Sequence, residues 1–253
     1  MEKKIIQLLF ICCIFHELII VSSALQVGFY AQKCRAAESI VQQEVQRSFF
    51  TDRSITAALL RMYFHDCFVR YVIIFFLLRV IYTKFRPFNS CFGSINYSKN
   101  TGNKQSEKNA GPNQSVRGYE LIDQIKSRLE SACPTTVSCA DIIALATRDS
   151  VALAGGPMYN ILTGRRDGLV SNPAEVNLPG PSLTVQEALK IFTNKGFILN
   201  DMVTLLGAHT VGITHCSLIQ DHISRFDGSM DPNLFTRLST CAARNNDPSV
   251  FLD

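Results

Sequence analysis

The segment that most constrains this chain is an apolar, helix-forming stretch, residues 57–69, with the sequence AALLRMYFHDCFV. If it is helical, Arg61 and His65 stand four residues apart, so their side chains leave the same face. A cation and a proton acceptor could then converge on one small ligand, while Phe64 and its apolar neighbours cover the rest of the helix. A core histidine beside a surface arginine is the commoner interpretation of an isolated pair. Other parts of the chain favour the functional interpretation.

Residues 1–24 have the layout of a secretory signal peptide, with a basic start, an apolar run and small residues up to Ala24. A permanent membrane anchor is the alternative, but the run is short and contains His16 and Glu17. We therefore expect that the signal segment is cleaved after Ala24 and that the protein is exported. The remaining residues, 25–253, are expected to form one domain.

Seven cysteines follow the signal segment, and in an exported chain they should form disulfides. They are Cys34, Cys67, Cys91, Cys133, Cys139, Cys216 and Cys241. An odd number cannot pair completely within one molecule, so at least one partner is missing or intermolecular.

Composition excludes some classes of function. The 253 residues are 47% hydrophobic, which is enough to bury a core and argues against general disorder. The net charge is only +4, and the basic residues are dispersed, so we expect no nucleic-acid partner.

Apolar periodicity predicts a mostly α fold. In addition to the first segment, we expect helices over residues 36–50, 116–132, 138–154, 184–195, 221–226 and 232–241. A further helix, capped by Asn200, should contain the apolar run 202–206. Thr184 and Glu187 have the spacing of a capping box, and Gly196 stands at a helix C-terminal cap.

The region that follows the apolar helix-forming stretch 57–69 has an unusual composition. Residues 71–82 are aromatic and β-branched, too short for a membrane span and too apolar for an ordinary loop, so a buried strand is one alternative. Residues 91–114 form a polar loop with glycosylation sequons at Asn96 and Asn113.

A second histidine, His209, stands where a predicted helix ends, between Gly207 and Gly212. A capping or surface role is the commoner one for such a residue. A zinc site with His215 and Cys216 fits none of the usual spacings. Two histidines on separate helices instead suit a cofactor held between helices.

Four motifs carry a family resemblance: LRMYFHDCFV at residues 60–69, SCADIIA at 138–144, GRRD at 164–167 and LGAHTVG at 206–212. Together they resemble the secreted plant class III haem peroxidases, the family of horseradish peroxidase. The resemblance implies an all-α haem peroxidase helical bundle, incomplete at its C-terminal (proximal) side, with haem b (protohaem) between the motif helices. It also implies hydrogen peroxide and small phenolic donors as substrates, no membrane partner, and a monomer that is extracellular (cell wall or apoplast) or vacuolar.

The same resemblance assigns roles around the iron. His209 matches the iron ligand, His65 the distal acid and base, and Arg61 the distal cation. Phe64 matches the ring that shields the iron, and Asn113 matches the residue that hydrogen-bonds the distal histidine, which argues against a glycan there.

The resemblance also assigns roles to residues away from the iron. Pro179 matches the proline that contacts aromatic donors, and Asp141 and Arg165 match a buried ion pair. The family's disulfides would join Cys34 to Cys133, Cys67 to Cys91, and Cys216 to Cys241. Cys139 is then the odd thiol.

Two calcium sites are also implied, and both are expected to be impaired. Candidate distal ligands are Asp66, the Val69 carbonyl, Ser94 and, through water, Glu107. Phe92 stands where the family has a carboxylate, and calcium needs six to eight oxygens. Candidate proximal ligands are Thr210 and Asp253, whose companions in the family are absent.

Two departures leave an alternative open. Residues 71–90 interrupt the family pattern like translated intron, and the chain is expected to stop short of the family's C-terminus. A catalytically impaired or dead haem-binding product of a mis-spliced or truncated gene copy is therefore the alternative to an active enzyme. A disulfide-rich binding module without cofactor is a third, less favoured possibility.

Overall fold

The structure, a computed structural model, describes residues 25–69, 106–168, 171–224, 228, 230–243 and 246–252. The chain divides into two compact units, Met1–Val176 and Asn177–Asp253. Several predictions lie outside the described residues: the signal segment 1–24, the insert 71–90, and Cys91, Ser94, Asn96 and Asp253. The single domain predicted over 25–253 stays a prediction.

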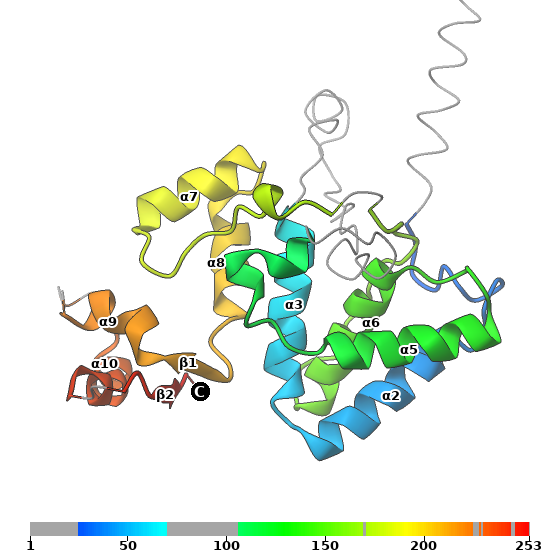
Figure 1. The fold of residues 1–253 in the computed structure, drawn as a ribbon, viewed down its shortest axis with the longest axis horizontal. Helices are drawn as coiled ribbons and strands as arrows, with labels where there is room; N and C mark the ends of the chain where they lie inside the picture. The colour runs from blue at the N-terminus through cyan, green and yellow to red at the C-terminus, as the bar shows by residue number, and fades with distance from the viewer. Residues whose placement is uncertain are drawn as a thin grey trace, which may run out of the picture. The chain divides into compact units, whose positions relative to one another are not determined.

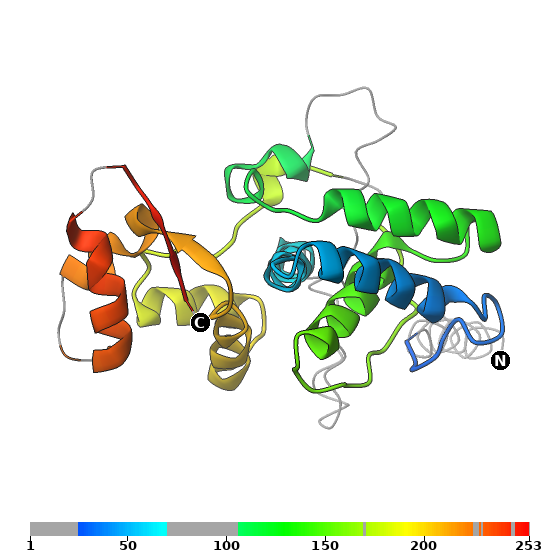
Figure 2. The same ribbon diagram turned by 90° about the horizontal axis from the view of Figure 1, so that it is seen from below.

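The described residues of the first unit include a bundle of four long helices. They are α2 (Ala37–Thr51), α3 (Ile55–Val69), α5 (Tyr119–Ala132) and α6 (Cys139–Leu153). Helix α6 packs against α2, α3 and α5, and α2 also packs along α5, as Figure 1 and Figure 2 both show. The predicted helix over 116–132 begins three residues later than expected, at Tyr119.

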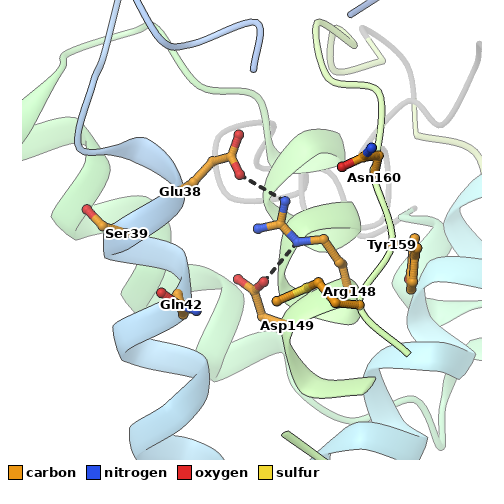
Figure 3. A pocket seen from close by; sticks show the side chains of 8 residues that line it. Glu38, Ser39, Gln42, Arg148, Asp149, Tyr159 and Asn160 are labelled. Carbon is orange, nitrogen blue, oxygen red and sulfur yellow. Dashed lines mark hydrogen bonds and ion pairs between the residues drawn. The ribbon is translucent and has the colours of Figure 1, made fainter. Parts of the chain in front are cut away.

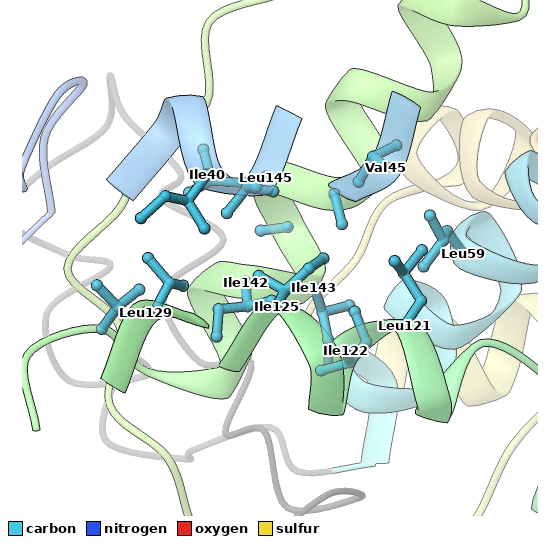
Figure 4. Packing of buried hydrophobic residues seen from close by; sticks show 14 of the residues in the cluster. Ile40, Val45, Leu59, Leu121, Ile122, Ile125, Leu129, Ile142, Ile143 and Leu145 are labelled. Atoms are coloured by element: carbon cyan, nitrogen blue, oxygen red, sulfur yellow. The ribbon is translucent and has the colours of Figure 1, made fainter. Parts of the chain in front are cut away.

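Each of these helices contributes a stripe of aliphatic side chains to one core, shown in Figure 4. The labelled members are Ile40 and Val45 from α2, Leu59 from α3, Leu121, Ile122, Ile125 and Leu129 from α5, and Ile142, Ile143 and Leu145 from α6. Burying one such side chain stabilises a fold by about 1.5–3 kcal/mol, so this core holds α3 in place.

Polar groups fix the start of α6. The Asp167 carboxylate accepts hydrogen bonds from the backbone N–H groups of Cys139 and Ala140, at 3.0 Å each. A carboxylate at a helix N-terminus satisfies orphan donors and complements the helix dipole. Burial nevertheless raises the pKa of Asp167, which outweighs the opposing effect of these two hydrogen bonds.

The predicted ion pair between Asp141 and Arg165 is confirmed. Arg165 Nη1 lies 3.0 Å from Asp141 Oδ1, and both side chains are buried. The other oxygen, Asp141 Oδ2, accepts from the Tyr30 hydroxyl at 2.7 Å and from the backbone N–H groups of Gly164 and Arg165 at 2.6 and 3.0 Å. The turn at 164–167 is therefore tied to α6 and to the N-terminal segment.

Two predicted disulfides are present. Cys34–Cys133 joins the residues just before α2 and just after α5. Cys216–Cys241 lies in the second unit. Cys67 is also disulfide-bonded, but its expected partner lies outside the described residues. Cys139 is a free thiol, as the family resemblance implies.

The second unit contains short helices and one two-stranded sheet. Its elements are α7 (Val185–Asn194), α8 (Leu199–Gly207), β1 (Ile213–His215), α9 (Cys216–Ser224), α10 (Pro232–Leu238), the 3-10 helix η5 (Ser239–Ala243) and β2 (Ser249–Phe251). β1 and β2 are antiparallel, with Ile213 opposite Phe251. The prediction of a helix over 221–226 has the wrong bounds, because α9 begins at Cys216, directly after β1.

The all-α fold class is confirmed, since the strands are short and peripheral. Across the part of the chain that the structure describes, none of the helices combines the length and hydropathy needed to span a bilayer.

Candidate active site

Arg61 and His65 lie side by side on α3, as their spacing predicts. Arg61 Nε donates a hydrogen bond to His65 Nε2 across 3.3 Å. His65 is only 7% exposed, whereas Arg61 is half-buried. Burial lowers the pKa of Arg61 below its ordinary value, and the nearby Tyr119 hydroxyl opposes this.

Asn113 fixes the form of the His65 imidazole. Asn113 Nδ2 donates to the backbone carbonyl of Glu107 at 2.7 Å, so the amide oxygen Oδ1 must be the atom that faces His65. His65 Nδ1 lies 2.6 Å from this oxygen. Because an amide oxygen only accepts, Nδ1 carries the proton and Nε2 keeps its lone pair. The hydrogen bond that the resemblance implies between these two residues is therefore present.

Two 3-10 turns place Asn113: η2 (Glu107–Asn109) and η3 (Gly111–Asn113). Ser106 caps η2 by accepting from the Lys108 backbone N–H. The Glu107 backbone N–H donates to the Ser171 hydroxyl at 3.0 Å, and the Glu107 carboxylate accepts from the Asn172 backbone N–H at 3.4 Å. This segment belongs to the predicted polar loop 91–114, yet its turns anchor it against the residues at 171–172.

The same segment also holds Arg61. Arg61 Nη2 donates to the Pro112 carbonyl at 3.1 Å and to the Ser115 hydroxyl at 3.0 Å, and Nη1 donates to the Ser115 carbonyl at 3.4 Å. Sequence reasoning missed Pro112 and Ser115. The one sequence feature that could have pointed to them as contacts of Arg61 was their position within two residues of Asn113.

Phe64 is buried beside the pair. Its ring makes an edge contact with the His65 ring, with centroids 6.1 Å apart, and stacks on Phe68 at 4.9 Å. These contacts hold the Phe64 ring in one orientation next to the imidazole.

His209 lies in the second unit, two residues after α8 ends at Gly207. Its Nδ1 lies 2.8 Å from the Leu205 carbonyl, which only accepts, so Nδ1 carries the proton. The lone pair is then on Nε2, which is the form of histidine that binds a metal. The chemistry of this donor fits an iron ligand.

The neighbours of His209 complete this helix end. The Thr210 hydroxyl donates to the Gly207 carbonyl at 2.8 Å. Gly212 has a φ of +89°, a conformation that side chains other than that of glycine rarely adopt. A zinc site with Cys216 is excluded because this sulfur is in a disulfide.

Pro179, the proline that the resemblance assigns to donor binding, lies half-buried in the loop that precedes α7.

The candidate calcium ligands are only partly described. Asp66 and Val69 are buried near the end of α3, and Glu107 is buried in η2. Outside the masked stretches, no three His, Cys, Asp or Glu side chains come close enough together to hold a metal ion. Ser94 and Asp253 are among the masked residues, so both calcium sites stay predictions.

A cavity of about 330 Å³ lies between α2 and α6, shown in Figure 3. Arg148 bridges its two carboxylates, with Nη1 2.8 Å from Glu38 Oε2 and Nε 2.9 Å from Asp149 Oδ1. None of the predicted site residues lines this cavity. Its charges are paired with one another, so we assign it no catalytic role.

An imidazole with its Nδ1 proton held by an amide oxygen, next to a guanidinium and on a helix of an all-α bundle, is the arrangement expected of a helical peroxidase. The fold and this site fit that class. A family model described as Peroxidase matches residues 41–253. The chain belongs to this peroxidase family.

Named relatives agree. The chain is 51% identical to Peroxidase 44 of Arabidopsis thaliana over 230 residues, which cover 90% of this chain and 67% of the relative. It is 52% identical to Peroxidase 57 and 49% identical to Peroxidase 28 of the same plant, in each case over 86% of this chain and 64% of the relative. The chain thus spans about two thirds of the length of these relatives.

Proposed function

We propose that this chain is a secreted haem peroxidase that reduces hydrogen peroxide and oxidises phenolic donors in one-electron steps. The observation that carries the proposal is the hydrogen-bonded row of Arg61, His65 and Asn113, in which His65 Nδ1 faces Asn113 and the Nε2 lone pair is directed away from Asn113, toward Arg61. Membership of the peroxidase family supports the reaction class.

His65 would act as base and then as acid. Its Nε2 accepts a proton from hydrogen peroxide and returns it to the departing oxygen, which leaves as water. Arg61 stabilises the negative charge that develops on the departing oxygen. Each such proton transfer contributes on the order of 10² to 10⁴ in rate. When bound, haem supplies the redox chemistry, and His209 Nε2 would be its iron ligand.

Several finer assignments belong to the same proposal. Pro179 would contact the phenolic donor. Asp66, Val69, Ser94 and Glu107 would serve one calcium ion, and Thr210 and Asp253 another, although carboxylates are few in both sets. Removal of residues 1–24, a glycan at Asn96, a monomeric state and an extracellular or vacuolar location follow from the sequence features and the family. The buried Asn113 side chain, which is 1% exposed, supports a hydrogen-bonding role there rather than a glycan.

The alternative is a catalytically impaired copy that still binds haem. Identity of about half to named peroxidases and the intact contacts of Arg61, His65 and Asn113 do not favour it.

Recombinant mature protein supplied with haem separates these possibilities. A Soret band together with peroxide-dependent guaiacol oxidation supports the enzyme, and a band without turnover supports the impaired copy. His65→Ala should keep the band and lose at least about 100-fold in the peroxide rate, whereas His209→Ala should lose or shift the band. His215→Ala, at an exposed histidine, is the matched control. Absence of a Soret band in the unmutated protein would refute the proposal.

A further inference from the structure

We propose that Ser115 is a positioning residue for the peroxide reaction, which it serves by holding the Arg61 guanidinium beside the His65 base. The inference rests on the proposed function and extends it to a residue outside the four motifs that carry the family resemblance. It rests on the proximity of two contacts in one segment. Asn113 accepts a hydrogen bond from His65, and Ser115, two residues further along the chain, accepts one from Arg61.

The guanidinium has five N–H groups in a rigid plane, so its position depends on where its acceptors lie. Nη2 donates to Pro112 O and Ser115 Oγ, Nη1 to Ser115 O, and Nε to His65 Nε2. Four of the five N–H groups therefore have acceptors among the described residues. Three of these acceptors come from Pro112, within η3, and Ser115, two residues after η3 ends, and they face the Nη atoms rather than the imidazole.

This arrangement has a consequence for substrate binding. In the structure the lone pair of His65 Nε2 accepts from Arg61. Hydrogen peroxide must take over this lone pair with its own proton, so the bond between Nε and Nε2 has to open. The bonds to Pro112 and Ser115 keep the guanidinium in place when that happens. A loosely held arginine would instead move away and leave the departing oxygen without its cation.

The Ser115 hydroxyl can be removed with little other change. Ser115 is exposed, and its backbone carbonyl is retained in Ser115→Ala, so only the acceptor Oγ is lost. A hydrogen bond to a charged group is strong enough that losing it, and with it the position of Arg61, should slow the peroxide step roughly tenfold. Ser115→Thr keeps the hydroxyl and should restore most of the rate.

The neighbouring residue provides a matched control. Gln114 is exposed, and its side chain makes no hydrogen bond within the described parts of the chain. Gln114→Ala therefore changes the same turn without touching Arg61, and it should react with peroxide at the rate of the unmutated protein.

The test uses the mature, haem-loaded chain in stopped-flow mixing with hydrogen peroxide and, separately, with guaiacol. Ser115→Ala should slow the peroxide step about tenfold and leave the donor step within about twofold, because Arg61 acts on peroxide. A Ser115→Ala protein that matches the unmutated rate, or that slows both steps equally, would overturn the inference.

A second measurement does not depend on haem. In the ¹⁵N-labelled apo-protein, the Arg61 Nε–H signal should be protected from exchange with water, and Ser115→Ala should reduce this protection while Gln114→Ala does not. If the unmutated enzyme fails to react with peroxide, the proposed function fails, and this signal still decides the role of Ser115. An Arg61 signal that is unchanged in Ser115→Ala contradicts it.

Discussion

Replacement of Asn113 by valine should disable the base while leaving the helix that carries it intact. Valine has a similar volume but no amide, so His65 Nδ1–H loses its acceptor at 2.6 Å and the Glu107 carbonyl loses its donor at 2.7 Å. The imidazole is then free to adopt the other neutral tautomer, with the proton on Nε2. In that form it cannot take a proton from hydrogen peroxide.

The size of the effect follows from these two contacts. Removing a group that orients a catalytic or metal-bound histidine typically costs 10- to 100-fold, or about 1.4–2.7 kcal/mol. Both partners left behind are buried, and an unsatisfied buried polar group costs about 1–3 kcal/mol of stability. We therefore expect a 10- to 100-fold slower peroxide step together with a loss of about 2–6 kcal/mol in the free energy of unfolding, at the upper end if no water enters.

A double-mutant cycle identifies the route of the effect. The peroxide step is measured by stopped flow in the unmutated protein, Asn113→Val, His65→Ala and the double variant, all below their unfolding temperatures. If Asn113 acts through His65, Asn113→Val changes nothing further once His65 is alanine. An equal loss in both backgrounds would refute the reasoning, since it would mean that Asn113 acts through the general fold.

Asp141→Asn should lower the free energy of unfolding by about 3–5 kcal/mol, because it removes the negative charge that faces the buried Arg165 guanidinium at 3.0 Å, whereas Tyr30→Phe removes one of the four contacts to the carboxylate and should cost about 1.5–3 kcal/mol. Urea denaturation measures both, and a Tyr30→Phe protein as unstable as Asp141→Asn would contradict this order. Burial raises the pKa of Cys139 to about 12, so at pH 8 its reactive thiolate is far scarcer than in an exposed cysteine, and iodoacetamide should label it only after unfolding. Rapid labelling of the folded protein, with Cys139→Ser as the control, would show that the thiol is not buried.

Local patterns predicted those parts of the structure that depend on neighbours in sequence. The spacing of Arg61 and His65 placed both on one face of α3, because both lie within a single helical segment. Thr184 and Glu187 form the capping box expected from their three-residue separation. Gly196 follows α7 with a φ of +79°, as its position at a helix end required.

Contacts between distant segments were predictable only through the family resemblance or not at all. Asp141 and Arg165, and Asn113 and His65, were paired by resemblance. The strands Ile213–His215 and Ser249–Phe251 were missed, because three residues carry too little alternation to signal a strand and their pairing spans more than 30 residues. The contact of Ser115 with Arg61 was missed because the only pattern that contains Ser115 is the sequon at Asn113, which indicates a glycan and not an acceptor for an arginine.

The two histidines reach the same tautomer by different means, and this difference has consequences for the site. The acceptor for His209 Nδ1 is the carbonyl of Leu205, four residues earlier, so the last turn of α8 is sufficient to set the form of the proposed iron ligand. The acceptor for His65 is Asn113, 48 residues away, and its orientation depends on the Glu107 carbonyl and on the turns that present it. The acceptor that sets the tautomer of the proposed iron ligand is therefore local in the sequence, whereas the acceptor for the proposed base depends on the tertiary fold of the first unit. A change that loosens the segment from 106 to 115 should therefore slow the reaction with peroxide while leaving the tautomer of His209 unchanged.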